Sequence, residues 1–65
     1  MAHEKLINLS EVKARTSRSK TTLYRLINNG EFPAPIKIGR SSVWPESEVN
    51  EWIINLIIKS RMEAV

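Results

Sequence analysis

The residues best suited to chemistry in this chain are cations, concentrated in its middle. Residues 13 to 40 hold seven lysines and arginines and one acid, which gives this window a net charge of +6. Residues 41 to 65 carry −2 and residues 1 to 12 carry −1. A cationic centre favours a polyanionic partner, because affinity for nucleic acid comes largely from neutralised phosphates. A solvated basic surface without a partner would show the same pattern. The seven cations are Lys13, Arg15, Arg18, Lys20, Arg25, Lys37 and Arg40.

One predicted helix, from Lys20 to Asn29, brings several polar groups onto one face. Its apolar residues recur at i, i+3 and i+4 and mark an inward stripe of Leu23, Leu26 and Ile27. Successive helical residues are about 100° apart, so the opposite face carries Thr21, Arg25 and Asn28, with Tyr24 on its flank. Such side chains can bind phosphates or base edges, and the helix N-terminus favours a phosphate. The alternative is an ordinary amphipathic helix with a polar outer face.

A shorter helix is predicted just before it. Ser10 is suited to the N-cap, and the helix runs from Glu11 to Thr16 with Val12 pointing inward. Ser19 is suited to the N-cap of the second helix, and Gly30 to the left-handed position that follows it. Two short helices joined by about three residues are typical of a helix-turn-helix.

The segment after the second helix is predicted to be extended. Residues 31 to 35 cannot be helical because they contain two prolines, and Phe32 is expected to pack back on the helices as a core residue. Residues 36 to 44 have the alternation and central turn of a short β-hairpin. Lys37 would lie on its first strand and Arg40 at its tip. This pattern favours a wing that reaches DNA, although a purely structural hairpin that closes the core would look the same.

The last predicted helix starts at Pro45 and runs to about Met62. Its inward stripe is expected to contain Val49, Trp52, Ile53 and Leu56, with Trp52 as the largest core residue. Ile54 and Ile58 fall near the opposite face, with Ile57 between the two. A small domain has no second layer to cover them, so this surface predicts a partner: a second copy, a cooperative array, an integrase or RNA polymerase.

Size and composition argue against several classes of protein. A 65-residue chain of 7.5 kDa allows one domain, and it can hardly enclose a catalytic cleft. The sequence has no cysteine and shows no nucleophile–base pair, glycine-rich phosphate loop or metal spacing, so we expect no enzyme, no cofactor and no metal. It also shows no apolar run that would span a membrane, so a cytoplasmic, nucleoid-associated protein is expected. The predicted organisation is an N-terminal tail with a short extended segment at 1–8 and a single domain at 9–65.

Four stretches of the chain, in this order and spacing, carry a family likeness. They are LSEV at 9–12, SKTTLYRLI at 19–27, GEFPAPIKIG at 30–39 and WPESEVNEWI at 44–53. Together they resemble the AlpA-like prophage regulators, small DNA-binding proteins related to phage excisionases and to the winged-helix domain of MerR-type regulators. The resemblance implies an α+β, mostly α, winged helix-turn-helix with a short hairpin wing and a C-terminal helix.

The resemblance also implies which residues bind double-stranded DNA. On the second helix they are Ser19, Lys20, Thr21, Thr22, Tyr24 and Arg25, and on the wing they are Lys37, Arg40 and Ser41. The turn before the second helix departs from the family, which often has Thr-Gly-Leu where this chain has Thr16-Ser17-Arg18. That change adds Arg18 as a cation that could touch the phosphate backbone.

The sequence is compatible with three functions. The first is a sequence-specific transcriptional regulator of prophage or integrated-element genes. The second is an excisionase-type recombination directionality factor that bends DNA beside an integrase. The third is a protein-interaction adaptor that uses the surface formed by Ile54, Ile57 and Ile58, with its basic charge incidental.

Overall fold

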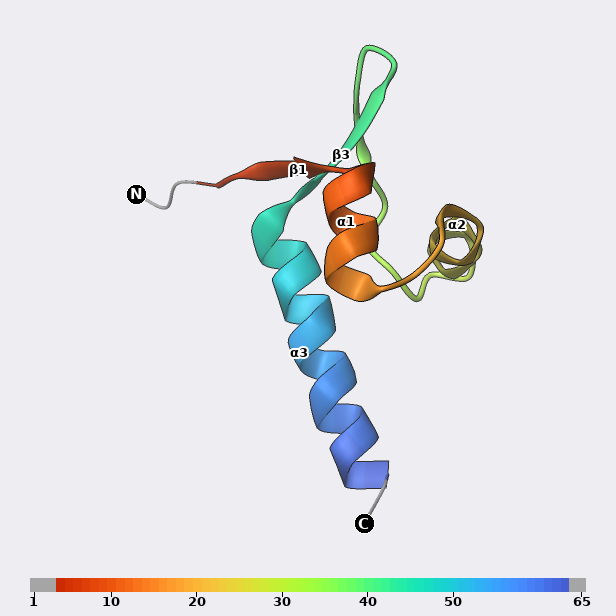
Figure 1. The fold of residues 1–65 in the computed structure, drawn as a ribbon, viewed down its shortest axis with the longest axis vertical. Coiled ribbons are helices and arrows are strands. Elements are labelled where there is room, and N and C mark those ends of the chain that lie inside the picture. The colour runs from red at the N-terminus through yellow and green to blue at the C-terminus, as the bar shows by residue number, and fades with distance from the viewer. Residues whose placement is uncertain (1–3, 64–65) are drawn as a thin grey trace.

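A computed structural model describes residues 4 to 63 as three helices and a three-stranded sheet. Residues 1 to 3 of the predicted tail, and the last two residues of the predicted domain, lie outside the described range. Figure 1 shows the hairpin and the last helix extending in opposite directions from the centre of the molecule. The elements in chain order are β1 (Leu6–Asn8), α1 (Leu9–Thr16), α2 (Lys20–Asn28), β2 (Ile36–Ile38), β3 (Ser41–Pro45) and α3 (Glu46–Glu63).

The extended segment predicted before the first helix is strand β1, and it belongs to the same sheet as the hairpin. The strand order is β1-β3-β2, with both pairs antiparallel. Ile7 lies opposite Trp44 in the β1–β3 pair and is buried. The Glu4 carboxylate accepts hydrogen bonds from the Ser47 hydroxyl at 2.6 Å and from the Ser47 N–H at 3.2 Å. Residues 4 to 8 therefore cap α3 and complete the sheet.

Helix α1 begins two residues earlier than the sequence predicted. Its N-cap is Asn8, whose Oδ1 accepts a hydrogen bond from the Glu11 N–H at 2.9 Å, so the prediction of Ser10 as the cap is wrong. Asn8 ends strand β1 with an extended backbone, which leaves its side chain free to reach the first turn. At the other end Ser17 adopts a left-handed conformation with φ 56°, and its N–H donates to Lys13 O.

Helix α2 begins at Lys20 as predicted and ends at Asn28, one residue before the predicted end. Ser19 is its N-cap and accepts a hydrogen bond from the Thr22 N–H at 3.2 Å. Gly30 follows the helix with φ 74°, a left-handed conformation that favours glycine. The Glu31 N–H then donates to Leu26 O at 2.7 Å, which turns the chain back along the helix. Both the Ser19 cap and the Gly30 terminator are confirmed.

The hairpin turns through two residues, Gly39 and Arg40, because Ile38 lies directly opposite Ser41. Gly39 has φ 60°, which matches the glycine required at the first central position of a type II′ turn. Strand β3 extends one residue beyond the predicted hairpin and ends at Pro45, so the prediction that the last helix starts at Pro45 is wrong and α3 begins at Glu46. The predicted hairpin is confirmed.

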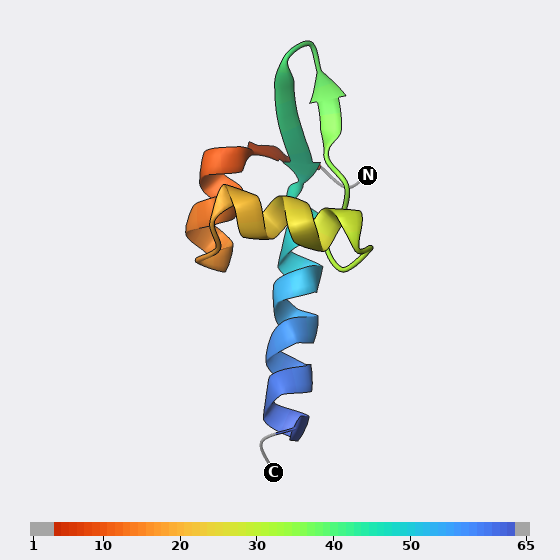
Figure 2. The ribbon, with the colours of Figure 1, turned by 90° about the vertical axis from the view of Figure 1, so that its right-hand side faces the viewer.

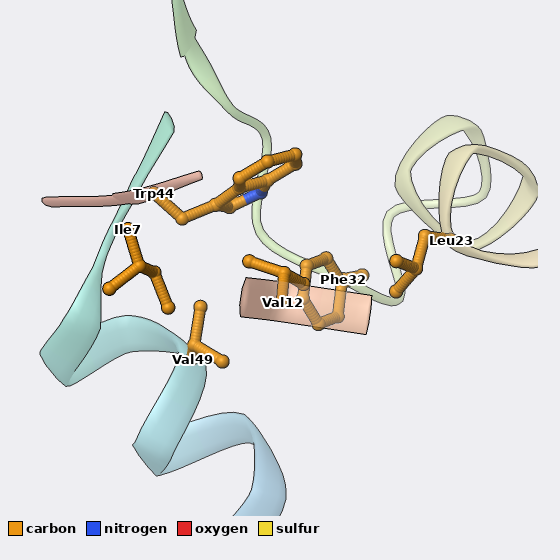
Figure 3. Packing of buried hydrophobic residues seen from close by; sticks show 6 residues of the cluster. All are labelled: Ile7, Val12, Leu23, Phe32, Trp44 and Val49. Carbon is orange, nitrogen blue, oxygen red and sulfur yellow. The ribbon is translucent and has the colours of Figure 1, made fainter. Parts of the chain in front are cut away.

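Six side chains form the core, and they come from the three helices, from strands β1 and β3 and from the proline segment, but not from β2 (Figure 3). Phe32 packs edge-on against two indoles, with ring centroids 6.4 Å from Trp44 and 4.9 Å from Trp52. The Trp44 Nε1–H donates to Pro33 O at 2.9 Å, and the Trp52 Nε1–H donates to Glu31 O at 2.7 Å. These contacts hold the proline segment against the helices and confirm Phe32 as a core residue. The six residues are Ile7, Val12, Leu23, Phe32, Trp44 and Val49.

Two predictions about residues of α3, Trp52 and Leu56, are wrong. The largest fully buried side chain is Trp44 rather than Trp52, which is only half-buried. Leu56 was placed on the inward stripe, yet it is 37% exposed. The reason is that α3 extends beyond the rest of the domain, as Figures 1 and 2 both show, so its C-terminal half has no layer to pack against. No helix between residues 4 and 63 is long and apolar enough to cross a membrane.

Candidate nucleic-acid interface

The outward face of α2 carries Thr21, Arg25 and Asn28, and all three side chains are exposed. Among residues 4 to 63, none of the three hydrogen bonds or forms an ion pair through its side chain with another residue of the chain. Lys20, at the first position of the helix, is also exposed. Together these groups offer a cationic donor-rich surface whose hydrogen-bonding capacity is not used by the fold.

The fold holds α2 so that this face stays clear. Leu23 is fully buried in the core, and Leu26 and Ile27 pack against it from the same side of the helix. Figure 2 views the molecule from the side on which α2 lies, and shows the helix crosswise to α3 at the surface of the domain. A rigid helix presented in this way has the geometry that fits a major groove.

Two predicted contact residues, one before α2 and one on it, lie away from its outward face. Arg18 and Thr22 line a groove of about 450 Å³ between α2 and α3, which Leu26, Trp52 and Lys59 also border. Thr22 is half-buried, and its hydroxyl oxygen accepts a hydrogen bond from the Ser19 hydroxyl at 3.0 Å. Ser19 and Thr22 therefore act first as a local hydrogen-bond pair that closes the N-terminus of the helix.

The wing is tied to α2 through one hydroxyl group. The Tyr24 hydroxyl donates to Ser42 Oγ at 3.3 Å, and the Lys37 ammonium donates to the same oxygen at 2.7 Å. Lys37 and Ser42 lie directly opposite each other in the β2–β3 pair, so both point to the sheet face that meets α2. Tyr24 is half-buried and sets the position of the wing relative to the helix.

Ser42 joins the wing to α2 and was not among the residues predicted from the sequence. With two donors directed at its oxygen, its own hydroxyl hydrogen remains available to a phosphate. The period-two alternation of a strand could have identified it, because Ser42 shares its face with Trp44 and with the facing Lys37. Ser41, which was predicted to contact DNA, pairs with Ile38 and points to the opposite face. Arg40 lies exposed in the turn.

Arg15 differs from the other central cations because it is paired with acids of the chain. Arg15 donates to the Glu11 carboxylate at 2.8 Å, to Glu46 at 2.8 Å and to Asn50 at 3.2 Å, which joins α1 to α3. The hydrogen bond from Arg15 lowers the pKa of Glu11, and the hydrogen bonds to Glu11 and Glu46 raise the pKa of Arg15. In the described part of the chain, Arg15 alone of the seven central cations forms an ion pair.

Between residues 4 and 63 no three histidine, cysteine, aspartate or glutamate side chains gather where a metal ion could be held. The groups that do gather are hydroxyls, amides and cations on α2 and the hairpin. Cations and neutral donors of this kind bind phosphates and base edges.

The fold and this surface define a winged helix-turn-helix of the DNA-binding class: two short helices, the second facing outward, followed by a cationic hairpin. The chain belongs to the prophage CP4-57 regulatory protein (AlpA) family, whose sequence model matches residues 5–57. The predicted family resemblance is thereby confirmed.

Individual relatives agree with this assignment. The chain is 34% identical over 58 residues to the "Uncharacterized protein ORF88" of Enterobacteria phage P4, which covers 88% of this chain and 66% of the phage protein. It is 48% identical over 40 residues to a protein of Mycobacterium tuberculosis named "putative DNA-binding protein", covering 62% of this chain and 50% of the relative. The chain thus spans between half and about two-thirds of the length of these relatives. No solved structure matches the chain significantly.

Proposed function

We propose that this protein is a sequence-specific transcriptional regulator of genes in a prophage or another integrated element. In this proposal α2 enters the major groove of double-stranded DNA, and the hairpin contacts the neighbouring phosphate backbone. The protein needs no cofactor and catalyses no reaction, and it resides with the chromosome in the nucleoid.

The observation that carries the proposal is the unpartnered outward face of α2. Thr21, Arg25 and Asn28 form no side-chain bond within the described chain, and no acid occurs between Lys13 and Asn29. Arg25 is the residue best suited to a guanine, because a guanidinium can donate to both the O6 and N7 acceptors of that base. Asn28 is best suited to an adenine, because its amide can donate to N7 and accept from the N6 amino group. The name of the Mycobacterium tuberculosis relative supports DNA as the partner.

The wing has a different role from the helix in this proposal. Lys37 stands on the sheet face that meets α2, and Arg40 stands at the tip of the turn. Long cations at these places are suited to phosphates, which hold the protein in register but carry little sequence information. Ser42 would add a neutral donor between helix and wing, because its oxygen already receives two hydrogen bonds.

The test begins with selection of bound sequences from random DNA, followed by affinity measurements on the selected site. Arg25→Ala and Thr21→Ala should each cost about 1–3 kcal/mol and relax the preference at one base pair. Lys5→Ala is the matched control, because it removes an exposed cation from the segment before β1, away from α2. If both α2 variants bind as tightly as the parent, the assignment of the reading helix is overturned.

The wing variants give a second readout. Lys37→Ala and Arg40→Ala should weaken binding to every sequence about equally. Each should also reduce the slope of the logarithm of the binding constant against the logarithm of the salt concentration by about one. A changed base preference with an unchanged salt dependence would contradict phosphate contact by the wing.

The selected site also separates regulation from recombination. A site in the promoter of an integrated element, with an effect on transcription in the absence of integrase, supports the regulator. Binding beside an attachment site that bends the DNA and changes excision, without an effect on transcription, would replace it with an excisionase-type role. Weak DNA binding without sequence preference at physiological salt would instead support the third function, a protein-interaction adaptor.

A further inference from the structure

The C-terminal half of α3 presents an apolar surface to solvent. Ile54 is 55% exposed and Ile58 is 51% exposed, on successive turns of the same side of the helix. Met62 continues this row one turn further and is 72% exposed, and Ile57 borders it at 44%. We call these four residues the distal stripe.

The distal stripe lies on the opposite side of α3 from the core. Val49 is buried, and Trp52 and Ile53 pack against the core cluster, whereas Ile54 is two residues, or about 200°, beyond Trp52. In Figures 1 and 2 this half of α3 extends past every other element of the domain. A short helix without a packing partner is marginal in water, and a row of exposed isoleucines adds to its cost.

Two residues of opposite charge, Glu51 and Arg61, lie at equal distances along α3 on either side of Leu56. Ile54 lies two residues before Leu56 and Ile58 two residues after it, while Glu51 lies five before and Arg61 five after. At 1.5 Å per residue, Glu51 and Arg61 are about 15 Å apart along one helix, so they cannot pair within the chain. The described part of the chain contains no ion pair that involves either residue.

We propose that the distal stripe binds the distal stripe of a second copy of this chain, with the two α3 helices antiparallel. A two-fold axis level with Leu56 places Ile54 against Ile58 of the other copy, and Glu51 against Arg61 of the other copy. Because the two-fold axis generates each contact twice, the interface contains two pairs of Ile54 with Ile58 and two ion pairs of Glu51 with Arg61. A parallel pairing would instead set Glu51 against Glu51 and Arg61 against Arg61.

This arrangement places two DNA-reading domains at opposite ends of the paired helices. In each copy the core is packed on the N-terminal half of α3, through Val49, Trp52 and Ile53, so the antiparallel pair carries one domain at each end. Neither α2 takes part in the interface. The dimer gains affinity for DNA by linking two separate sites, because the second binding event is then intramolecular.

The experiment is sedimentation equilibrium of the full chain without DNA, over a wide range of protein concentration. The parent should show a reversible monomer–dimer equilibrium, and Ile54→Glu/Ile58→Glu should remain a monomer at every concentration. Arg61→Glu should weaken the dimer roughly ten-fold, because two attractive pairs become repulsive. The charge-exchanged variant Glu51→Arg/Arg61→Glu should recover most of that loss.

Lys59→Glu is the matched control, because it makes the same charge change on the α3 face that borders the α2 groove, and it should leave the equilibrium unchanged. A parent that stays monomeric at the highest concentration overturns the proposal. So does an equal effect of Lys59→Glu and Arg61→Glu, or no recovery in the charge-exchanged variant. Affinity for a single DNA site is measured separately, so this result does not depend on the proposed function.

Discussion

Replacing Ser17 by glycine should stabilise the domain, because of the backbone conformation at the turn between α1 and α2. Ser17 is the only non-glycine residue in the described chain with a positive φ, at φ 56° and ψ 32°. Its side chain is exposed and forms no hydrogen bond with the rest of residues 4 to 63, so its removal leaves no partner unsatisfied. The capping bond from its N–H to Lys13 O uses only the backbone and is retained in the variant.

The size of the effect follows from two opposing terms. A residue with a Cβ in the left-handed region costs about 1–2 kcal/mol, which glycine avoids. Glycine in turn gives the unfolded chain more freedom, which costs about 0.5–1 kcal/mol. The net expectation for Ser17→Gly is a gain of roughly 0.5–1 kcal/mol in the free energy of unfolding, or about 2–8 °C in Tm for a domain of this size.

The assay is thermal unfolding followed by circular dichroism, with Ala14→Gly as the matched control. Ala14 is exposed in the interior of α1, where glycine has no conformational advantage, so that variant should lose about 1 kcal/mol and have a lower Tm. If Ser17→Gly lowers the Tm as Ala14→Gly does, the left-handed conformation carries no cost at this position and the reasoning is refuted. The same variant restores the residue that the family often has in this turn.

Three other perturbations test the fold. Trp44→Phe removes the hydrogen bond to Pro33 O and part of the largest fully buried side chain. Urea denaturation should therefore show a loss of about 2–3 kcal/mol in the free energy of unfolding, and a loss well under 1 kcal/mol would contradict the packing of Trp44. Gly39→Val forces a β-branched residue into φ 60° and should cost about 1–2 kcal/mol in the same assay, whereas an unchanged midpoint would exclude the assigned turn. The pKa of Glu11 is lowered by its hydrogen bond with Arg15, so this pair stabilises the fold above the usual glutamate pKa of about 4.3 and ceases to do so as the pH falls through the folded-state value. The difference in Tm between the parent and Glu11→Gln should therefore shrink on acidification below about pH 4, and a constant difference would argue against the pair.

The parts of the fold that the sequence predicted depend on short-range signals. Ser19 and Gly30 bound α2 because a capping hydroxyl and a left-handed glycine act within a few residues of the helix ends. Gly39 ends strand β2 in the same local way, and the prolines beside Phe32 exclude a helix whatever surrounds them. The outward face of α2 follows from the helical period alone.

Where two local signals compete, sequence reasoning failed. Asn8 and Ser10 are equally competent caps, and the choice between them was made by strand β1, which ends at Asn8 only because it pairs with β3. Trp44 and Trp52 are equally apolar in the sequence. Trp44 is the one enclosed because its strand is covered on the side that faces the helices.

The sequence by itself therefore determined the order of elements, the outward face of α2 and the family to which the chain belongs. Only the tertiary structure decided how these parts meet. The Tyr24 hydroxyl reaches Ser42 across 18 residues, and Arg15 reaches Glu46 across 31. Leu56 is left exposed because the domain ends before α3 does. Contacts between distant segments depend on the packing of the whole core, and no short-range pattern of residues encodes which side chain will lie opposite which.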